Sequence, residues 1–261
     1  MGLPLWAHRY RPRTVLTVHL DAATFDSWYH YWALHTLSAG WSYVLIGDLV
    51  ALVLVWANPG NTWHYVRPLV TWVHESGHAI ATVLLSGEVH GMRLNRDTSG
   101  VTRCAVATHR GLFGMFRDGL VSFAGTPTPM IVGAAIAVGL CYGMVRLIIG
   151  VIALALVLTL PQLRNWWGLL VVLTLGVLMT ICWVAPAAVQ ATILGIMAGV
   201  LSLGGLKTVF EEHQKRANRT GEGDTEAAAA AMHLPVVFIE GAWLGIWAAS
   251  TLAALAVLVA H

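Results

Sequence analysis

Seven stretches of the chain are predominantly apolar over about 20 residues, the length that a membrane-spanning helix needs. Short polar or proline-marked breaks separate these stretches. Runs of this length predict helices that cross a membrane rather than the core helices of a water-soluble domain. The predicted spans are Ser42–Ala57, Pro68–Ser86, Gly119–Cys141, Met144–Pro161, Trp166–Ala185, Ala187–Leu206 and Pro235–Ala260.

Two parts of the chain fall outside this pattern. Residues 1–41 contain no continuous apolar run, so we expect a cytoplasmic or interfacial N-terminal segment ahead of a single transmembrane domain over residues 42–260. After the second span, His90–Asn95 and Val101–Val106 flank the turn sequence Asp-Thr-Ser-Gly, which predicts two short strands. The predicted fold class is an all-α polytopic membrane protein with six to seven transmembrane helices and one small cytoplasmic β-hairpin.

The composition agrees with a lipid environment. Of 261 residues, 57% are hydrophobic and 11% charged, with a mean hydropathy of +0.69. Soluble domains have about 45–50% apolar and about 25% charged residues. A soluble enzyme and a disordered chain are thereby excluded, and the net charge of +2 gives no reason to expect a nucleic-acid partner. The three cysteines show no CxxC spacing, which favours buried thiols over a disulfide framework: Cys104, Cys141 and Cys182.

Basic residues fall unevenly on the two sides of seven alternating spans. One side receives 13 of the 15 Lys and Arg residues, and the other receives only Arg67 and Arg146. Cytoplasmic loops of membrane proteins carry the excess of Lys and Arg. The asymmetry therefore predicts that the N-terminus and the two long loops, 87–118 and 207–234, lie in the cytoplasm.

The second span contains the pattern HExxH, as His74-Glu75-Ser76-Gly77-His78. Residues four apart lie on one face of a helix, so the two imidazoles can bind one Zn²⁺ while Glu75 acts as general base. A chance match and a structural polar patch are the competing interpretations. An ionisable residue near the centre of a bilayer costs roughly 2.5–3.5 kcal/mol, and three within five residues favour a metal site.

A catalytic zinc usually has three protein ligands, so HExxH leaves one to be found elsewhere. Four side chains are candidates on sequence alone. Asp48 lies in the first span, Asp224 in the last hydrophilic loop, and His233 and Glu240 near the start of the last span. Asp224 also precedes an alanine run and could simply cap a helix. Spacing does not choose among the four.

At these residues the chain resembles the site-2 protease family of intramembrane zinc metallopeptidases, and most of all a compact bacterial branch of actinobacterial type. The resemblance covers most of the chain from about residue 70 onward. It rests on four stretches: HESGHAIA at 74–81, GMRLNRDTSGVTR at 91–103, AGTPTPMIVGAA at 124–135 and GDTEAAAAAMHLP at 223–235. The family's third zinc ligand is an aspartate in a late segment, and the matching position here is Asp224.

The resemblance implies an endopeptidase of the plasma membrane in which His74, His78 and Asp224 bind Zn²⁺. Glu75 would then act first as general base and afterwards as general acid. The expected substrate is a single-span membrane protein, cut in or near its transmembrane segment. Independently of the resemblance, a hairpin with a free edge can pair with an unwound peptide; the alternative is a solvated hairpin without a partner. The expected substrate-binding residues are Thr98, Ser99, Gly100, Val101, Gly125 and Pro127.

Two other functions compete with proteolysis. A metal-handling transporter would need further ionisable residues along a span, and only Asp48 and Glu240 are available. A non-catalytic relative would bind membrane segments without cutting them, and the intact Glu75 argues against it.

Overall fold

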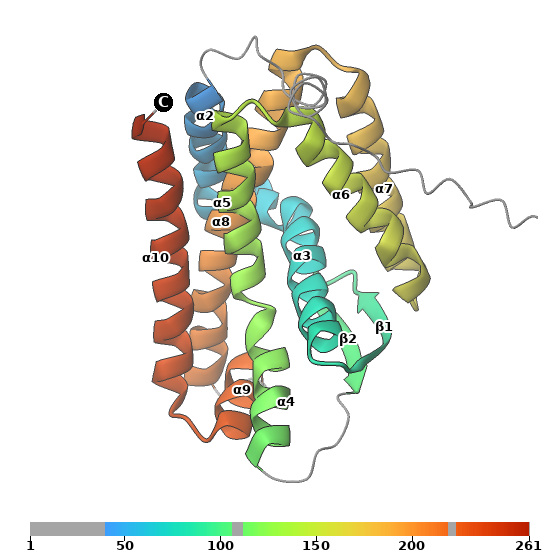
Figure 1. Ribbon diagram of the computed structural model, residues 1–261, viewed down its shortest axis with the longest axis vertical. Helices are drawn as coiled ribbons and strands as arrows, with labels where there is room; N and C mark the ends of the chain where they lie inside the picture. The colour runs from blue at the N-terminus through green and yellow to red at the C-terminus, as the bar shows by residue number, and fades with distance from the viewer. Residues whose placement is uncertain (1–39, 106–111, 219–222, 261) are drawn as a thin grey trace, which may run out of the picture.

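The computed structural model describes residues 40–105, 112–218 and 223–260 (Figure 1). Residues 1–39 of the predicted N-terminal segment, and Val106 of the second predicted strand, therefore lie outside the described residues. The described elements are α2 (Gly40–Leu52), extended by a π-helical turn (Val53–Ala57), α3 (Thr62–Leu84), β1 (Glu88–Leu94), β2 (Gly100–Ala105), α4 (Leu112–Ala124), α5 (Pro127–Cys141), α6 (Val145–Thr159), α7 (Trp166–Val184), α8 (Ala187–Ala217), α9 (Asp224–Met232) and α10 (Val236–Ala260).

Within these described ranges, five helical segments are long and apolar enough to cross a membrane: Gly40–Ala57, Val145–Gln162, Trp166–Val184, Ala187–Ala217 and Val236–Ala260. A sixth span is formed if α4 and α5 are taken together, although the pair is bent by 54°. The predicted continuous span Gly119–Cys141 is thus two helices, because Pro127 begins α5 and cannot continue the hydrogen bonding of α4. The predicted all-α membrane fold is confirmed.

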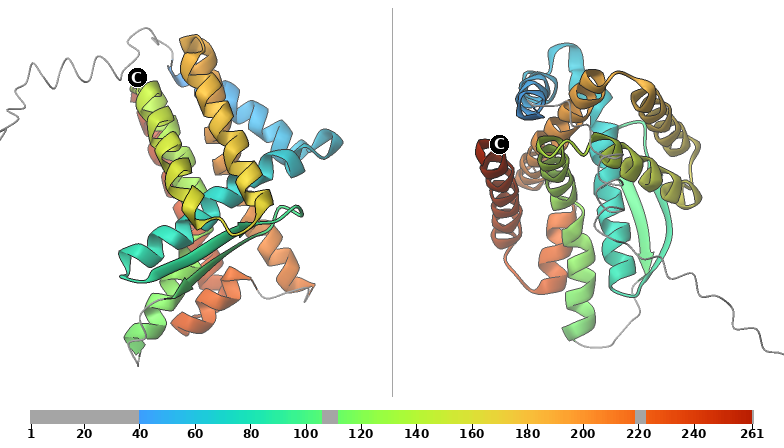
Figure 2. Two further views of the ribbon diagram at one scale, coloured as in Figure 1. Left: turned by 90° about the vertical axis from the view of Figure 1, so that its right-hand side faces the viewer. Right: turned by 45° about the horizontal axis from the view of Figure 1, so that its top comes forward.

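The helix that carries HExxH forms as predicted, but α3 is not among the segments apolar enough to span. Trp63 and Val70, in its first half, lie against Gly204 of α8, while Gly77, in its second half, lies against the α4–α5 break. Both halves of α3 therefore lie beside the middle stretches of longer segments, namely α8 and the α4–α5 pair. Figure 2 shows α3 and the hairpin crossing the bundle at a steep angle to the long helices, with α4, α9 and the end of α8 on one side of them. We call the end of the bundle on that side the site end.

The position of α3 corrects the predicted alternation of seven spans. The start of α2 and the end of α10 lie together at the opposite end of the bundle, which we call the far end (Figure 1). With five or six candidate spans in the described residues, the alternation no longer fixes the side of the N-terminus, which stays a prediction. The charge asymmetry itself persists: of the ten described basic residues, Arg146 belongs to the start of α6, which lies at the far end, whereas the other nine belong to α3, the hairpin, α4, the α6–α7 connection and the second half of α8.

The predicted hairpin is confirmed as an antiparallel pair of strands, with Leu94 opposite Gly100 and Glu88 opposite Ala105. The outer edge of β1 is covered by the α6–α7 connection, in which the Arg164 amide donates to the Met92 carbonyl at 2.9 Å. The two strands form a two-stranded sheet, so the outer edge of β2 has no strand partner among the described residues. Only one edge of the hairpin is therefore available for a further strand.

Close helix packing surrounds α8. Gly47 of α2 and Gly195 of α8 lie so close that a Cβ on either would overlap the backbone of the other helix. Small residues permit this approach, which supplies packing energy where lipid gives helices little hydrophobic reason to associate. Elsewhere along the same contact, the packing leaves a cavity.

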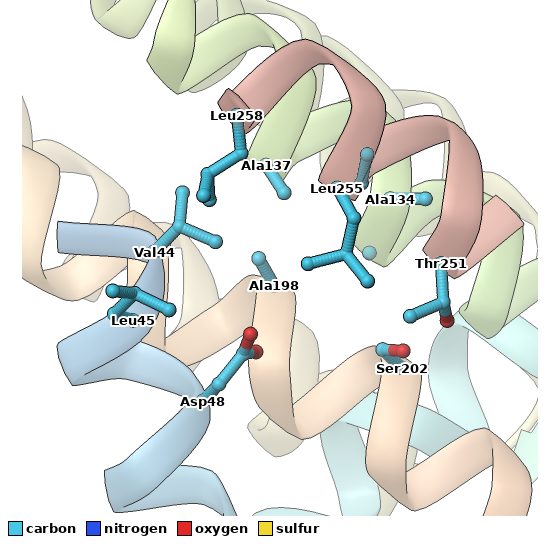
Figure 3. Close-up of a pocket in the computed structure, with 12 residues that line it drawn as sticks. Val44, Leu45, Asp48, Ala134, Ala137, Ala198, Ser202, Thr251, Leu255 and Leu258 are labelled. Atoms are coloured by element: carbon cyan, nitrogen blue, oxygen red, sulfur yellow. The ribbon is translucent and has the colours of Figure 1, made fainter. Parts of the chain in front are cut away.

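This cavity of about 50 Å³ lies between α2, α5, α8 and α10 (Figure 3). Its polar side chains are Asp48, Ser202 and Thr251, and the rest of its lining is aliphatic or glycine. The Thr251 hydroxyl is buried without a hydrogen-bond partner in the described chain. We call this space the Asp48 cavity.

Candidate metal centre

The helix α3 places His74 and His78 on one face, one turn apart. Their imidazole centroids are 4.8 Å apart, and their Nε2 atoms approach to 3.1 Å. Polar residues are accommodated inside this helix because their side chains bond back to its carbonyls: Ser76 donates to Trp72 and Thr82 to His78. The HExxH segment therefore keeps regular helical geometry while its ring nitrogens converge.

The third group comes from a segment about 150 residues further along the chain. Asp224 is the first residue of α9, and its Oδ2 atom lies 2.8 Å from Nε2 of His74 and 3.2 Å from Nε2 of His78. Of the four sequence candidates for a third ligand, the structure brings only Asp224 to the histidines. Within the described residues, His74, His78 and Asp224 form a cluster of side chains that could hold a metal ion.

The donor set fits zinc. At Zn–N and Zn–O bond lengths of about 2.0–2.2 Å, the ligand atoms of a tetrahedral ion are roughly 3.3 Å apart. The three separations here, 2.8, 3.1 and 3.2 Å, come within about 0.5 Å of that value. Two imidazoles and one carboxylate are a donor set found in catalytic zinc sites, and three protein ligands leave a fourth position open.

A contact behind His78 fixes which of its nitrogens is free. Nδ1 of His78 lies 2.7 Å from the Val121 carbonyl oxygen, which can only accept a hydrogen bond. Nδ1 therefore carries the proton and donates it, so Nε2 of the neutral ring keeps a lone pair directed at His74 and Asp224. Such a bond from the other ring nitrogen is typical of metal-bound histidine.

Asp224 is held in its charged form. Burial raises the pKa of its carboxyl group, but the neighbouring imidazoles of His74 and His78 lower it more, and the result is well below the ordinary value of 3.8. Its position is set by α9, where the Gly223 amide donates to Glu226 at 3.0 Å and Met232 packs on Gly119 of α4. A negative carboxylate facing two imidazoles favours a cation between them.

Glu75 lies on the adjacent face of α3 and is buried, with 4% of its surface exposed. Its Oε2 atom accepts a hydrogen bond of 2.6 Å from the Thr102 hydroxyl on β2. Its carboxylate also lies against Gly100, where any Cβ would overlap it. Strand β2 therefore contacts Glu75 at two positions.

The small residues of the 124–135 stretch face the ring nitrogens. A Cβ at Gly125 would overlap the imidazoles of both His74 and His78, so only glycine fits there. Pro127 is buried at the start of α5, two residues beyond. The break between α4 and α5 thus lies directly against the candidate metal centre.

The remaining expected substrate residues lie in the hairpin. Thr98 is buried in the turn, and its carbonyl accepts a 2.8 Å hydrogen bond from Thr71 of α3. Ser99 bonds to Asp97 within the turn, and Val101 is half exposed on the outer face of β2. Of the four expected substrate residues in the hairpin, Gly100 is the one that lies against the Glu75 carboxylate.

The other candidate ligands have different surroundings. Glu240 pairs with Arg216 and His213, each at 3.2 Å, and so joins the end of α8 to α10. His233 ends α9 with a left-handed backbone, at φ 54°. Asp48 faces its own cavity. None of these three is in contact with His74 or His78.

Sequence reasoning missed two groups that the structure adds. Thr102 belongs to a strand that was expected to bind substrate, yet its hydroxyl reaches Glu75. The carbonyl of Val121 orients His78. The alternation of a strand next to HExxH could have indicated an inward-facing hydroxyl, but a backbone carbonyl leaves no signal in a sequence.

Comparison with known proteins agrees with this geometry. The chain matches the family described as Peptidase M50B-like over residues 45–258, which covers α3, the hairpin, the α4–α5 break and α9. No curated protein and no solved structure matches it. Because the match takes in most of the chain, including every residue of the candidate centre, the protein belongs to the Peptidase M50B-like family, that is, to the site-2 proteases.

Proposed function

We propose that this protein is a zinc-dependent intramembrane endopeptidase. The observation that carries the proposal is the convergence of His74, His78 and Asp224 beside a buried Glu75, in a chain of the Peptidase M50B-like family. Two ring nitrogens and a charged carboxylate meet within hydrogen-bonding distance. A bound Zn²⁺ would supply Lewis-acid polarisation of the scissile carbonyl and would lower the pKa of water to about 7.

The chain's own residues divide the remaining work. Glu75 takes a proton from the attacking water, whose oxygen bonds to the scissile carbonyl carbon, and then passes that proton to the nitrogen as the C–N bond breaks. His78 is kept in one orientation by its bond to Val121. The products are a carboxylic acid and an amine, and transfer of the remaining water proton gives a carboxylate and an ammonium group, so the atoms and protons of hydrolysis balance.

The free edge of β2 is the proposed substrate-binding surface. Inside a helix, the backbone N–H groups are hydrogen-bonded to carbonyls of the same helix. A transmembrane substrate must therefore be extended before it is cut. A strand can hold an extended peptide by main-chain hydrogen bonds. Since β1 is covered by the α6–α7 connection, the substrate would lie along β2, next to Gly100 and Glu75. A single-span membrane protein is the proposed substrate class.

Glu75→Gln tests the mechanism. The variant should bind zinc as the wild type does, because Glu75 is not a ligand, while cleavage of single-span test proteins in co-expressing cells should fall by at least about 100-fold. Zinc content by elemental analysis and product bands on a gel are the two measurements. Wild-type protein without zinc, or a Glu75→Gln variant that still cleaves, would contradict the proposal. Zinc transport into vesicles without cleavage would favour the transporter.

We further propose that the site end faces the cytoplasm, because nine of the ten described basic residues belong to α3, the hairpin, α4, the α6–α7 connection and the second half of α8. The chain would then begin α2 and end α10 on the opposite side of the plasma membrane. Alkaline phosphatase fused after residue 261 should be active, since that enzyme needs an oxidising compartment, and a fluorescent protein that matures only in the cytoplasm should be dark there. The reverse pattern would overturn the orientation.

A further inference from the structure

Thr102 has a position that the proposed chemistry does not by itself require. Residues of β2 alternate between its two faces, and Gly100, Thr102 and Cys104 are directed inward, while Val101 and Arg103 are exposed. The strand thus turns one hydroxyl towards α3. That hydroxyl lies 2.6 Å from the Glu75 carboxylate and 3.2 Å from the Glu75 carbonyl.

A hydroxyl has one proton to donate, and the shorter contact assigns it to the carboxylate. Hydrogen bonds to ionised groups are shorter and stronger than neutral ones, and burial strengthens them further. Glu75 has three side-chain torsions and no other hydrogen-bond donor in the described residues reaches its carboxylate. Thr102 is therefore the group that restricts where the Glu75 oxygens lie.

Gly100 acts on the same carboxylate from the same strand. Its missing side chain leaves the space that the Glu75 carboxylate fills. On β2, Thr102 thus donates a hydrogen bond to the Glu75 carboxylate, and Gly100, two residues away, leaves space for it. The outer edge of this strand is also the unpaired edge of the hairpin.

We propose that Thr102 is a positioning residue for Glu75, and that β2 thereby sets the distance between the general base and a substrate held on its outer edge. The inference rests on the proposed proteolytic function. Because Thr102 acts through Glu75 and points away from the exposed face, its loss should lower kcat and leave KM nearly unchanged. A purely structural role would instead lower thermal stability and zinc content together with activity.

The test compares Thr102→Val, which keeps the shape and removes the hydroxyl, with Thr102→Ser, which keeps the hydroxyl. Full-length protein in lipid vesicles would be assayed on a single-span test protein that the wild type cleaves. We expect Thr102→Val to lose about 10–100-fold in kcat, with KM within about twofold and zinc unchanged. Thr102→Ser should stay within about threefold of the wild type.

A matched control is Thr174→Val on α7, where an exposed hydroxyl bonds only to the Leu170 carbonyl of its own helix. It should leave kcat and KM unchanged. If Thr102→Val does not fold, Thr102→Ala against Thr102→Ser gives the same comparison. Wild-type kcat in Thr102→Val, or an equal loss in Thr102→Ser, would overturn the inference.

A second readout separates this inference from the proposed function. A hydroxamate linked to an apolar tripeptide chelates zinc and places its own hydroxyl against the general base, so its affinity reports the position of Glu75 without any cleavage. Thr102→Val should weaken its binding about tenfold, and Thr102→Ser should restore it. Wild-type protein that binds the hydroxamate but cleaves nothing would refute the proteolytic function alone. Equal affinity in the wild type and Thr102→Val would refute the role of Thr102.

Discussion

Two regions of this molecule place a carboxylate among apolar helices, and they differ in what surrounds it. At the candidate metal centre, Asp224 faces two imidazoles and Glu75 accepts a hydrogen bond from Thr102. In the Asp48 cavity, no hydrogen bond or ion pair reaches the carboxylate from the described residues, and the Thr251 hydroxyl is likewise unpartnered (Figure 3).

The difference lies in convergence rather than residue type. Three separate segments, α3, β2 and α9, bring their polar groups together at the metal centre, whereas α2, α8 and α10 each contribute one oxygen-bearing side chain to the cavity. A buried charge such as that of Glu75 is stable only with partners of opposite sign or with hydrogen bonds, whereas the exposed Asp48 needs neither. The metal centre supplies both, and we therefore expect function to depend on it and not on the cavity.

Asp224→Ala should have the largest effect of the changes that probe this comparison. It removes the only carboxylate among the three proposed ligands, leaving two imidazoles that approach to 3.1 Å. We expect zinc affinity to fall at least about 100-fold and cleavage to become undetectable. Metal titration and a cleavage assay measure the two effects. Retention of zinc by this variant would place the third ligand elsewhere.

Gly125→Ala should have an intermediate effect, because it leaves every proposed ligand in place. The added Cβ would overlap the ring nitrogens of His74 and His78, so at least one imidazole must move. We expect a loss of about 10–100-fold in zinc affinity, in line with changes next to metal ligands elsewhere. Unchanged zinc binding would show that the backbone at the α4–α5 break can shift to make room for the added methyl group.

An Asp→Ala and a Gly→Ala substitution at positions outside the metal centre should have the smallest effects. Asp48→Ala removes a carboxylate that has no described partner, and Gly241→Ala adds a methyl group where no atom lies within 4 Å. Both variants should keep zinc and cleave within about twofold of the wild type, since changes without lost partners or overlaps are mild. A large loss of cleavage in Asp48→Ala would abolish the distinction between the two regions.

The sequence predicted the fold class and most of the elements because lipid imposes a simple rule. Apolar runs of spanning length, the HExxH helix and the turn of the hairpin are all local signals, and each corresponds to a described element. The error concerned α3. Its length suits a span, but Arg67, Glu75 and the two histidines make it less apolar than the five spans, and it lies at a steep angle to them (Figure 2).

The sequence alone predicted His74, Glu75 and His78, because four-residue spacing puts the two histidines on one face of a helix, with Glu75 on the adjacent face, whatever the rest of the chain does. The choice of Asp224 over Asp48, His233 and Glu240 depended on the family resemblance until the structure placed it 2.8 Å from His74. Only the tertiary structure could bring Thr102 to Glu75, the Val121 carbonyl to His78 and Gly125 to both rings. Such contacts join segments tens of residues apart, and the packing of whole helices and strands determines them.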